Sequence, residues 1–297
     1  MKITALRAAH LDDLYNVYRQ ATVSMPHCRF TPSRNHFQAS LMHPAQPTTQ
    51  IFVAEDEERA VGFATLLSRG NAPDGAREAT ISALFVQDGA GQGADVGQAL
   101  LDACLLQARA LNIQRLLAFA SDHQACPIIS YNAGWDGLSD CLPWVGRLLA
   151  KNRFMPYHRE LHLVCNGEFF PPSLARSTAP IQLLKRTELN GHQTLAASLG
   201  DQEVGDCEYS SLAEISDDPR AAQCGYIWGL YVAPECRQQG IARHLLTMAL
   251  DQLAQQHCTS CWLTTASDNW AAQPLYLALG FEIVDTSTSF RKTLMTG

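Results

Sequence analysis

The sequence predicts two tandem α+β domains, each a mixed and mostly antiparallel sheet flanked by helices. The chain has 297 residues, which is more than one hydrophobic core usually organises. The same order of strand and helix patterns occurs twice along it, and a stretch rich in proline and serine, residues 166–180, lies between the two copies. We therefore expect a first domain over residues 1–166, a linker over 167–180 and a second domain over 181–297.

Composition and charge exclude several classes of protein. Hydrophobic residues make up 46% of the chain and charged residues 17%, as in globular proteins, and no run approaches the roughly 18 apolar residues that span a bilayer. The N-terminus has no apolar segment of the signal-peptide kind, so we expect a cytoplasmic protein without membrane contact. The net charge of −7 argues against nucleic-acid binding and suits a cationic amine as partner.

The ten cysteines are scattered through a chain without a secretion signal, which favours reduced thiols in hydrophobic cores over disulfides. Cys258 and Cys261 form the one CxxC pair in the sequence. A zinc site would need two further ligands, and His257 is the one histidine beside the pair. We therefore expect no metal site.

The first copy begins with an apolar stretch, two helix patterns and a hairpin. Period-two alternation predicts the strands, and acidic residues before an apolar stripe predict the first helix start. In chain order we expect a strand at 3–9, a helix led by 12–14, a helix at 33–41, hairpin strands at 51–54 and 61–67, a strand at 81–86 and a helix at 98–110.

The second copy has a shorter start. Only residues 181–191 precede its first strand at 193–199, so the two opening helices of the first copy have no counterpart. Strands at 203–209 and 226–232 follow, and then a helix at 243–256. The two long helices should pack on their sheets through leucine stripes, namely Leu100, Leu101, Leu105 and Leu245, Leu246, Leu250, Leu253.

The most informative stretch runs from the apolar strand of the second copy through Pro234 into the start of its long helix. Residues 237–242 read Arg-Gln-Gln-Gly-Ile-Ala. Glycine lets the backbone turn tightly and approach a ligand, the first N–H groups of a helix are available donors, and the helix dipole adds positive charge. With a guanidinium beside it, this loop is suited to bind a pyrophosphate.

This V-x-P-x-x-R-x-x-G-x-A pattern, followed by Asn269 and by Leu-Tyr-x-x-x-Gly-Phe over residues 275–281, resembles the GNAT superfamily of N-acetyltransferases. Either motif alone is unspecific, but here both occur in order and at the expected separation. The resemblance implies an enzyme that transfers an acetyl group from acetyl-CoA, as co-substrate, to an amine that attacks the thioester directly. It also implies a sheet that is splayed where acetyl-CoA enters.

The resemblance implies roles for individual residues. The loop and the end of the strand would bind the pyrophosphate and the pantetheine of acetyl-CoA. The residues that would bind this co-substrate are Leu230, Tyr231, Val232, Arg237, Gln238, Gln239, Gly240, Ile241, Ala242 and Asn269. A backbone N–H at a strand bulge near Leu230 would stabilise the oxyanion. Tyr276 would be the acid that protonates the leaving thiolate.

The resemblance does not fix the group that deprotonates the amine. The family often carries a glutamate on the strand before the loop, whereas the inward positions here are Tyr226 and Trp228. Alternation along the preceding strand places Glu203 and Glu208 on opposite faces, with Asp206 on the same face as Glu208. We choose Glu208 as the catalytic base; the alternatives are a solvated strand edge without a role and water relayed by tyrosines.

The first copy departs from both motifs. Gln92 stands in place of the arginine of the loop, and Asp95 in place of its glycine, where a carboxylate would repel a pyrophosphate. Leu149 and Arg153 stand in place of the tyrosine and the glycine of the second motif. We expect a degenerate first domain, although surplus glycines in its loop leave acetyl-CoA binding open. An aromatic-rich insertion at 131–144 is either a specificity element or a surface excursion.

Three functions are compatible with these observations. We favour an N-acetyltransferase that acts on a primary amine of a small molecule, with catalysis in the C-terminal domain. The missing helices leave the acceptor side of that domain open. The first domain either completes the acceptor site or only stabilises the second domain. The alternatives are an acyl-CoA-binding sensor without turnover and an acyltransferase for another acceptor or acyl chain. Pairing of strand edges would leave little sequence trace, so a homodimer also stays open.

Overall fold

The chain folds into two compact units in a computed structural model. The model describes residues 1–23, 25–26, 30, 32–44, 48–87, 93–120, 137–167, 179–189, 191–214 and 216–294. Unit 1 comprises Met1–Glu160 with Asp285–Gly297, and unit 2 comprises Leu161–Val284. Within the described part, no helix is both long and apolar enough to cross a membrane.

Unit 1 contains most of the first copy. Its elements are β1 (Lys2–Ala5), η1 (Ala8–His10), α1 (Leu11–Thr22), α2 (Arg34–Met42), β2 (Thr49–Asp56), β3 (Arg59–Asn71), β4 (Arg77–Val86), α3 (Gly93–Ala110), β5 (Arg115–Ala118), β6 (Leu138–Ser139) and α4 (Pro143–Lys151), followed by the first part of β7 (Met155–Asn166). All strand neighbours from β1 to β4 are antiparallel, and β4 pairs with β5 in parallel. The mixed, mostly antiparallel sheet that the sequence predicts is thus confirmed.

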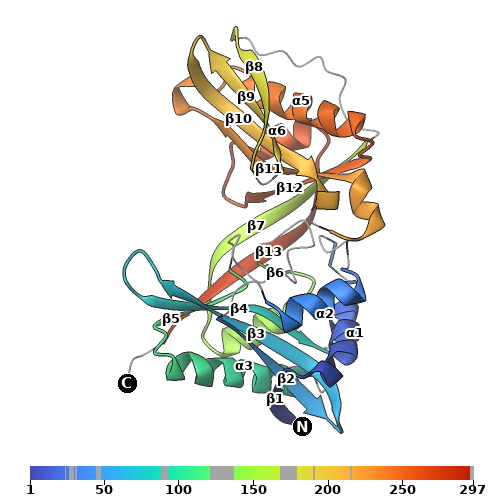
Figure 1. Cartoon of the computed structure of the whole chain (residues 1–297). Helices are drawn as coiled ribbons and strands as arrows, with labels where there is room; N and C mark the ends of the chain where they lie inside the picture. Colours follow the sequence, from blue (N-terminus) through green and yellow to red (C-terminus); the bar gives the residue numbers. More distant parts are fainter. Residues whose placement is uncertain are drawn as a thin grey trace. The chain divides into compact units, whose positions relative to one another are not determined.

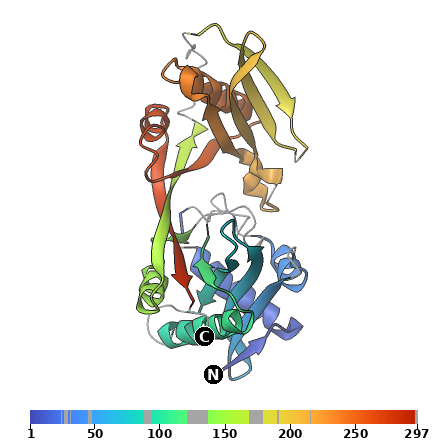
Figure 2. The same ribbon diagram turned by 90° about the vertical axis from the view of Figure 1, so that its left-hand side faces the viewer.

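Helices cover both faces of the sheet of unit 1, with α1 and α2 on one face and α3 on the other (Figures 1 and 2). Tyr18, Phe37, Phe63 and Phe85, from α1, α2, β3 and β4, form one aromatic cluster with neighbouring ring centroids 5.1–6.2 Å apart. On the α3 face the predicted leucine stripe is buried, as expected: Leu100, Leu101 and Leu105. These contacts set the position of α3 at the end of β4.

The helix α3 starts five residues earlier than we predicted, at Gly93 and not at Gln98. Asp95 lies in its first turn, where a carboxylate is favourable beside the positive end of the helix dipole. Gly97 is also helical, and a Cβ on it would lie 2.8 Å from the Trp144 ring, so this glycine allows α3 to pack closely on α4. It therefore has a packing role inside the helix.

Unit 2 contains the second copy. Its elements are the second part of β7, β8 (Gln182–Thr187), β9 (Gln193–Leu199), β10 (Gln202–Ser211), η3 (Leu212–Glu214), η4 (Pro219–Gln223), β11 (Cys224–Val232), η5 (Pro234–Cys236), α5 (Ile241–Gln255), β12 (Ser260–Ala266), α6 (Gln273–Ala278) and the start of β13 (Glu282–Thr293). The strand order is β8-β9-β10-β11-β12-β7, with β8 to β11 antiparallel and β11 parallel to β12. Among the described residues, β8 and β9 follow one another without an α-helix, in line with the predicted short start.

The helix α5 packs on one face of this sheet through the predicted stripe, which is fully buried: Leu245, Leu246, Leu250 and Leu253. Gly225 on β11 lies directly beneath it, since a Cβ there would lie 2.5 Å from a methyl carbon of Leu253. Figure 1 shows α5 lying along the sheet of unit 2. The start of α5 is thereby held beside the end of β11.

The last strand of each copy pairs in the unit of the other copy. In unit 1, Phe290–Thr293 of β13 pair with Arg115–Ala118 of β5. In unit 2, β7 lies beside β12. Most of the expected linker, residues 168–178, and part of the aromatic-rich insertion, residues 131–136, lie outside the described residues. The division into domains at 1–166 and 181–297 follows the order of the two copies, and it stays a prediction.

Candidate active site

The sheet of unit 2 opens between β11 and β12. The two strands pair in parallel from Cys224 with Ser260 to Ile227 with Leu263. Beyond these pairs β11 continues to Val232 and β12 to Ala266, but no further pair joins them. Backbone groups on the facing edges of both strands are therefore left for another partner.

A β-bulge at Trp228 marks the place where the strands part. Glu208 of β10 lies opposite Gly229, and the next residue, Tyr209, lies opposite Ile227, so Trp228 is the extra residue of β11. The expected bulge near Leu230 is thus present two residues earlier. Such a bulge redirects a backbone N–H out of the ladder, as oxyanion stabilisation requires.

The backbone of Leu230 and Val232 faces the opened side of β11. The Ala233 N–H donates to the Val204 carbonyl of β10 at 2.8 Å, so the backbone groups of Ala233 point toward β10. Since successive residues of an antiparallel strand point alternately to either side, Val232 and Leu230 point away from β10, and Tyr231 toward it. The side chain of Tyr231 is exposed.

The loop after β11 ends in an uncapped helix start. Gly240 is the N-cap of α5 in the left-handed region, at φ 77°, and no side chain caps the helix. Gln238 also has a positive φ of 62°. Ile241 is buried, which anchors the first turn, while the first N–H groups of α5 have no partner inside the helix. Gln238, Gln239, Gly240 and Ala242 thus lie where the sequence predicts an anion-binding loop.

Arg237 provides the positive charge of this loop. Its Nε–H donates to the Val232 carbonyl at 3.1 Å, which holds the guanidinium at the end of β11. Its side chain is exposed, and no carboxylate of the described residues pairs with it. The remaining N–H groups of the guanidinium are therefore suited to bind an anion.

Asn269 and Tyr276 lie on the segment between β12 and β13. The side-chain Nδ2 of Asn269 donates to Thr265 Oγ1 at 3.0 Å, and the Ala272 N–H donates to the Asn269 carbonyl. The ring of Tyr276 packs against Phe281, with centroids 6.0 Å apart. Asn269 thus lies directly after the end of β12, where its N–H donates to the Ala266 carbonyl at 3.0 Å, and Tyr276 lies on α6 against Phe281.

Burial tunes the phenol of Tyr276. Its side chain is 7% exposed, and its hydroxyl makes no hydrogen bond to a described residue. Burial, with a smaller contribution from the buried Cys207, raises the pKa of Tyr276 to about 12. The phenol is therefore protonated at neutral pH, which a proton donor requires.

Carboxylates gather on the sheet face opposite α5, and one of our predictions about them is wrong. Glu203 and Glu208 share a face. They lie opposite Ser198 and Thr194, which are an even number of residues apart on β9 and therefore point to the same side of the sheet. The physical reason is a bulge between Glu203 and Gly205, which shifts the period-two alternation of β10. Glu203 is neutralised by a bidentate pair with Arg186, at 3.0 and 3.1 Å.

Asp206 lies on this same face, as predicted. Burial raises the pKa of the Asp206 carboxyl above its ordinary value, and the nearby charge of Glu203 adds to the shift. Glu208 lies next along the strand, and its Oε1 is 2.6 Å from Nδ1 of His192. The carboxylates that Arg186 does not neutralise are thus Asp206 and Glu208.

His192 was not predicted from the sequence to act in the site. Its ring stacks on Trp228 at a centroid distance of 4.6 Å and an interplanar angle of 9°. Trp228 donates from Nε1 to Ser210 Oγ at 2.9 Å, and the Tyr226 ring lies 4.4 Å from it. His192 precedes β9 by one residue, so only the pairing of β9 with β10 brings it to Glu208. No local sequence pattern carries that information.

The first copy carries other residues at the positions of Tyr276 and Gly280. Arg153 has a φ of 63° where Gly280 has one of 83°, so the same turn follows the short helix in both copies. Leu149 is buried at the position of the tyrosine. Asp95 lies in the first turn of α3, and Gln92 lies outside the described residues. A degenerate first copy stays a prediction.

The described cysteines are free thiols, and the CxxC pair is buried in the core of unit 2. Burial raises the pKa of Cys258 to about 11 and that of Cys261 well above its ordinary value, so both thiols are protonated at neutral pH. In the part of the chain that the structure describes, no three His, Cys, Asp or Glu side chains are grouped as metal ligands.

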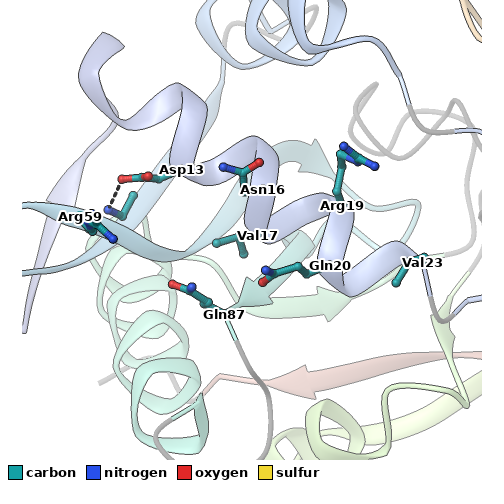
Figure 3. A pocket seen from close by; sticks show the side chains of 9 residues that line it. Asp13, Asn16, Val17, Arg19, Gln20, Val23, Arg59 and Gln87 are labelled. Carbon is teal, nitrogen blue, oxygen red and sulfur yellow. Dashed lines mark hydrogen bonds between the residues drawn. The ribbon is translucent and has the colours of Figure 1, made fainter.

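Unit 1 has a cavity of about 510 Å³ between α1 and the ends of β3 and β4 (Figure 3). Asp13 Oδ2 accepts the Ala60 N–H at 3.1 Å at one end of it. The cavity lining is largely polar and exposed, and it consists of Asp13, Asn16, Val17, Arg19, Gln20, Val23, Arg59, Ala60 and Gln87. It contains none of the residues that the sequence predicts to act.

Comparison with known sequences gives two findings. The acetyltransferase (GNAT) family profile matches residues 11–129, in the first copy, and residues 158–281, which begin in β7 and cover most of the second copy; together they are more than half of the chain. N-alpha-acetyltransferase 30 of Saccharomyces cerevisiae is 40% identical over 57 residues. That match covers 19% of this chain and 32% of the yeast protein, so it relates only a part of each.

Comparison with solved structures supports the fold. A tandem GNAT protein from the clavulanic acid biosynthesis pathway superposes with a TM-score of 0.67 at 17% identity, and the match covers 98% of both chains. A GCN5-related N-acetyltransferase from Sphaerobacter thermophilus matches with a TM-score of 0.62 at 14% identity, over 98% of this chain and 95% of that one. A glucosamine N-acetyltransferase region of a fungal multi-domain β-N-acetylglucosaminidase reaches 0.72 at 14% identity, over 98% of this chain and 38% of that one. The predicted tandem fold is thus confirmed.

Proposed function

The chain belongs to the acetyltransferase (GNAT) family, a family of acyltransferases that use acetyl-CoA, and from this premise we propose that its second copy transfers an acetyl group to the primary amine of a small molecule. The observation that carries the proposal is the opening between β11 and β12 beside the uncapped start of α5. Acetyl-CoA consists of an extended thioester arm and a pyrophosphate. The open strand edge can pair with the arm, and the helix N-terminus can bind the pyrophosphate.

The proposed acetyl-CoA site follows the chain from β11 into α5. Pantetheine amides pair with the outward backbone groups of Leu230 and Val232, as an added strand would. The pyrophosphate is bound by Arg237 and by the N–H groups around Gly240. Asn269 hydrogen-bonds the pantetheine arm from the opposite side of the opening.

Tyr276 is the proposed acid. Its phenol is protonated at neutral pH, all the more so since burial raises its pKa to about 12, and its hydroxyl is not committed to another described residue. When the C–S bond of the thioester breaks, the sulfur leaves as a thiolate and takes the phenolic proton. Negative charge that develops on the acetyl oxygen is stabilised by backbone N–H groups at the Trp228 bulge.

The acceptor is proposed to be a cation before it reacts. Asp206 and Glu208 face the same side as the bulge residue Trp228, and they attract an ammonium group to the opening. Aromatic side chains of Tyr226 and Trp228 form an apolar wall beside the carboxylates. A small primary amine with an apolar body fits this combination.

The first copy is proposed to be degenerate and to transfer no acetyl group. Leu149 provides no phenol, and Asp95 places a negative charge in the first turn of α3. An anion at that helix start would be repelled.

The experiment is an assay of free coenzyme A released from acetyl-CoA over a panel of primary amines, with product masses determined. Wild-type chain should acetylate at least one amine, and Arg237→Ala should lower kcat/KM for acetyl-CoA. A chain that binds acetyl-CoA without turnover of any amine would support the sensor function and contradict the proposal. A chain that does not bind acetyl-CoA would contradict both.

A further inference from the structure

Glu208 and His192 form a carboxylate–imidazole pair, and the function proposed above gives its imidazole no role. Oε1 of Glu208 is 2.6 Å from Nδ1 of His192. The two residues are 16 positions apart, and they meet because Glu208 lies opposite Thr194, two residues beyond His192, in the antiparallel pairing of β9 with β10. The pair therefore depends on the pairing of β9 with β10.

The imidazole is held in place by an aromatic stack. One face of Trp228 lies parallel to the His192 ring at 4.6 Å, and the indole itself is fixed by its hydrogen bond to Ser210. Trp228 is the bulge residue at which β11 leaves β12. The imidazole is thus positioned at the edge of the opening where acetyl transfer is proposed.

The short contact determines which ring nitrogen carries the proton. A carboxylate can only accept, so Nδ1 of His192 must be the donor in the 2.6 Å hydrogen bond. The neutral imidazole then has its lone pair on Nε2. A carboxylate that accepts from one nitrogen of a histidine, and so sets the tautomer of the ring, is the arrangement of a general base with its orienting partner.

We propose that His192 is the general base of the second copy and that Glu208 is its positioning residue. The inference rests on the proposed acetyltransferase function and supplies the base which that function lacks. Nε2 takes one proton from the acceptor ammonium, and the neutral amine forms a bond to the acetyl carbon as the C–S bond breaks. The thiolate takes the proton of Tyr276. The nitrogen that has attacked still carries one proton more than an amide does, and this proton passes through water to the Tyr276 phenolate. His192 releases its proton to solvent.

The first test reads the tautomer of His192 without any acceptor. Long-range ¹H–¹⁵N spectra of uniformly labelled full chain at alkaline pH separate protonated from unprotonated ring nitrogens, and His192→Gln assigns the signals. Wild type should show protonated Nδ1 and unprotonated Nε2. Glu208→Gln should lose this preference, whereas Glu203→Gln, whose carboxylate pairs with Arg186, should keep it. A wild-type ring with protonated Nε2 would overturn the proposal.

The second test separates a base from a merely structural residue. Phenethylamine is protonated at neutral pH, like other alkylamines of pKa about 10.4, whereas its β,β-difluoro analogue is far less basic and needs no base. His192→Gln should lower kcat/KM about 10²-fold or more for phenethylamine and less than about tenfold for the analogue. The calorimetric Kd for acetyl-CoA should stay unchanged.

The outcomes distinguish this inference from the function on which it rests. If wild type acetylates neither amine and no other primary amine, the acetyltransferase proposal fails and the base proposal fails with it. If wild type is active and His192→Gln loses equal activity on both amines, or none, only the base proposal fails.

Discussion

Leu149 and Tyr276 hold the same position in the two copies of this fold. The Phe154 N–H donates to the Leu149 carbonyl at 3.0 Å, and the Phe281 N–H donates to the Tyr276 carbonyl at 3.1 Å. Phe154 and Phe281 are both buried beneath the turn. The backbone of the second motif is therefore common to both copies, and the phenol is what distinguishes them. A phenol at this position is thus found in the second copy and not in the first.

Tyr276→Phe should lower kcat for acetylation while the Kd for acetyl-CoA changes little, because only the proton donor is removed. Loss of a general acid costs about 10²-fold or more. Tyr209→Phe is the matched control, since Tyr209 is also a buried tyrosine of unit 2 whose hydroxyl has no partner among the described residues. Steady-state kinetics with calorimetry checks both variants. Equal losses of turnover and acetyl-CoA binding in Tyr276→Phe would rule out the acid role.

Gly240→Ala should weaken acetyl-CoA binding, because φ 77° at the N-cap of α5 is unfavourable for any residue with a Cβ. A left-handed conformation costs a non-glycine residue roughly 1–2 kcal/mol, and relief of that strain would rotate the N–H groups of the loop. Gly200→Ala is the control, since Gly200 also has a positive φ, of 58°, in a turn away from the loop. A calorimetric Kd that changes equally in both variants would refute a special role of Gly240.

The geometry of the loop that we propose binds a pyrophosphate was predictable from sequence, because it depends on consecutive residues. Arg237, Gly240 and the helix start are local features, and the structure places each one where the motif indicates. The tandem fold was predictable for a related reason, since each copy repeats its own periodic patterns. Leucine stripes gave the buried faces of both long helices correctly.

The pair that we propose as base and positioning residue was not predictable, because it depends on strand register. The bulge between Glu203 and Gly205 moves Glu203 onto the face of Glu208, against simple alternation. A bulge of this kind leaves no periodic signal, although Gly205 is a hint: a Cβ there would lie 2.6 Å from the Tyr231 carbonyl oxygen. His192 reaches Glu208 across two strands, so its role requires the three-dimensional pairing. The start of α3 was predicted late because its glycines resemble a loop.

Acid should destabilise unit 1 through Glu55. Hydrogen bonds from Lys2 and then Thr4 lower the pKa of Glu55 from 4.5 to about 2, and His10 Nε2 lies 2.6 Å from the same carboxylate. A carboxyl whose pKa is lower in the folded state stabilises the fold above pH 4.5, and this contribution is lost as the pH falls from 4.5 toward 2.

Glu55→Gln should therefore flatten the acid limb of the stability curve between these two pH values, as measured by urea unfolding at a series of pH values. Glu58→Gln, at the exposed turn of the same hairpin, should leave the curve of the wild type unchanged. If the free energy of unfolding of Glu55→Gln fell with falling pH as steeply as that of the wild type, other carboxylates would dominate the loss of stability in acid.

Gly225→Ala should destabilise unit 2, because the added methyl group would lie 2.5 Å from a methyl carbon of Leu253 and push α5 away from β11. Overpacking of this kind costs about 1–3 kcal/mol. Gly229→Ala on the same strand should cost far less, since its nearest neighbour would be 3.9 Å away. Thermal unfolding of the two variants checks the difference, and equal melting temperatures would contradict the packing argument.

Calorimetric titration of acetyl-CoA into the full chain tests the central claim, that one copy binds and transfers the acetyl group, most directly. We expect one site per chain, lost in Arg237→Ala and retained in Asp95→Ala. Two sites per chain, or a single site that survives Arg237→Ala, would contradict it.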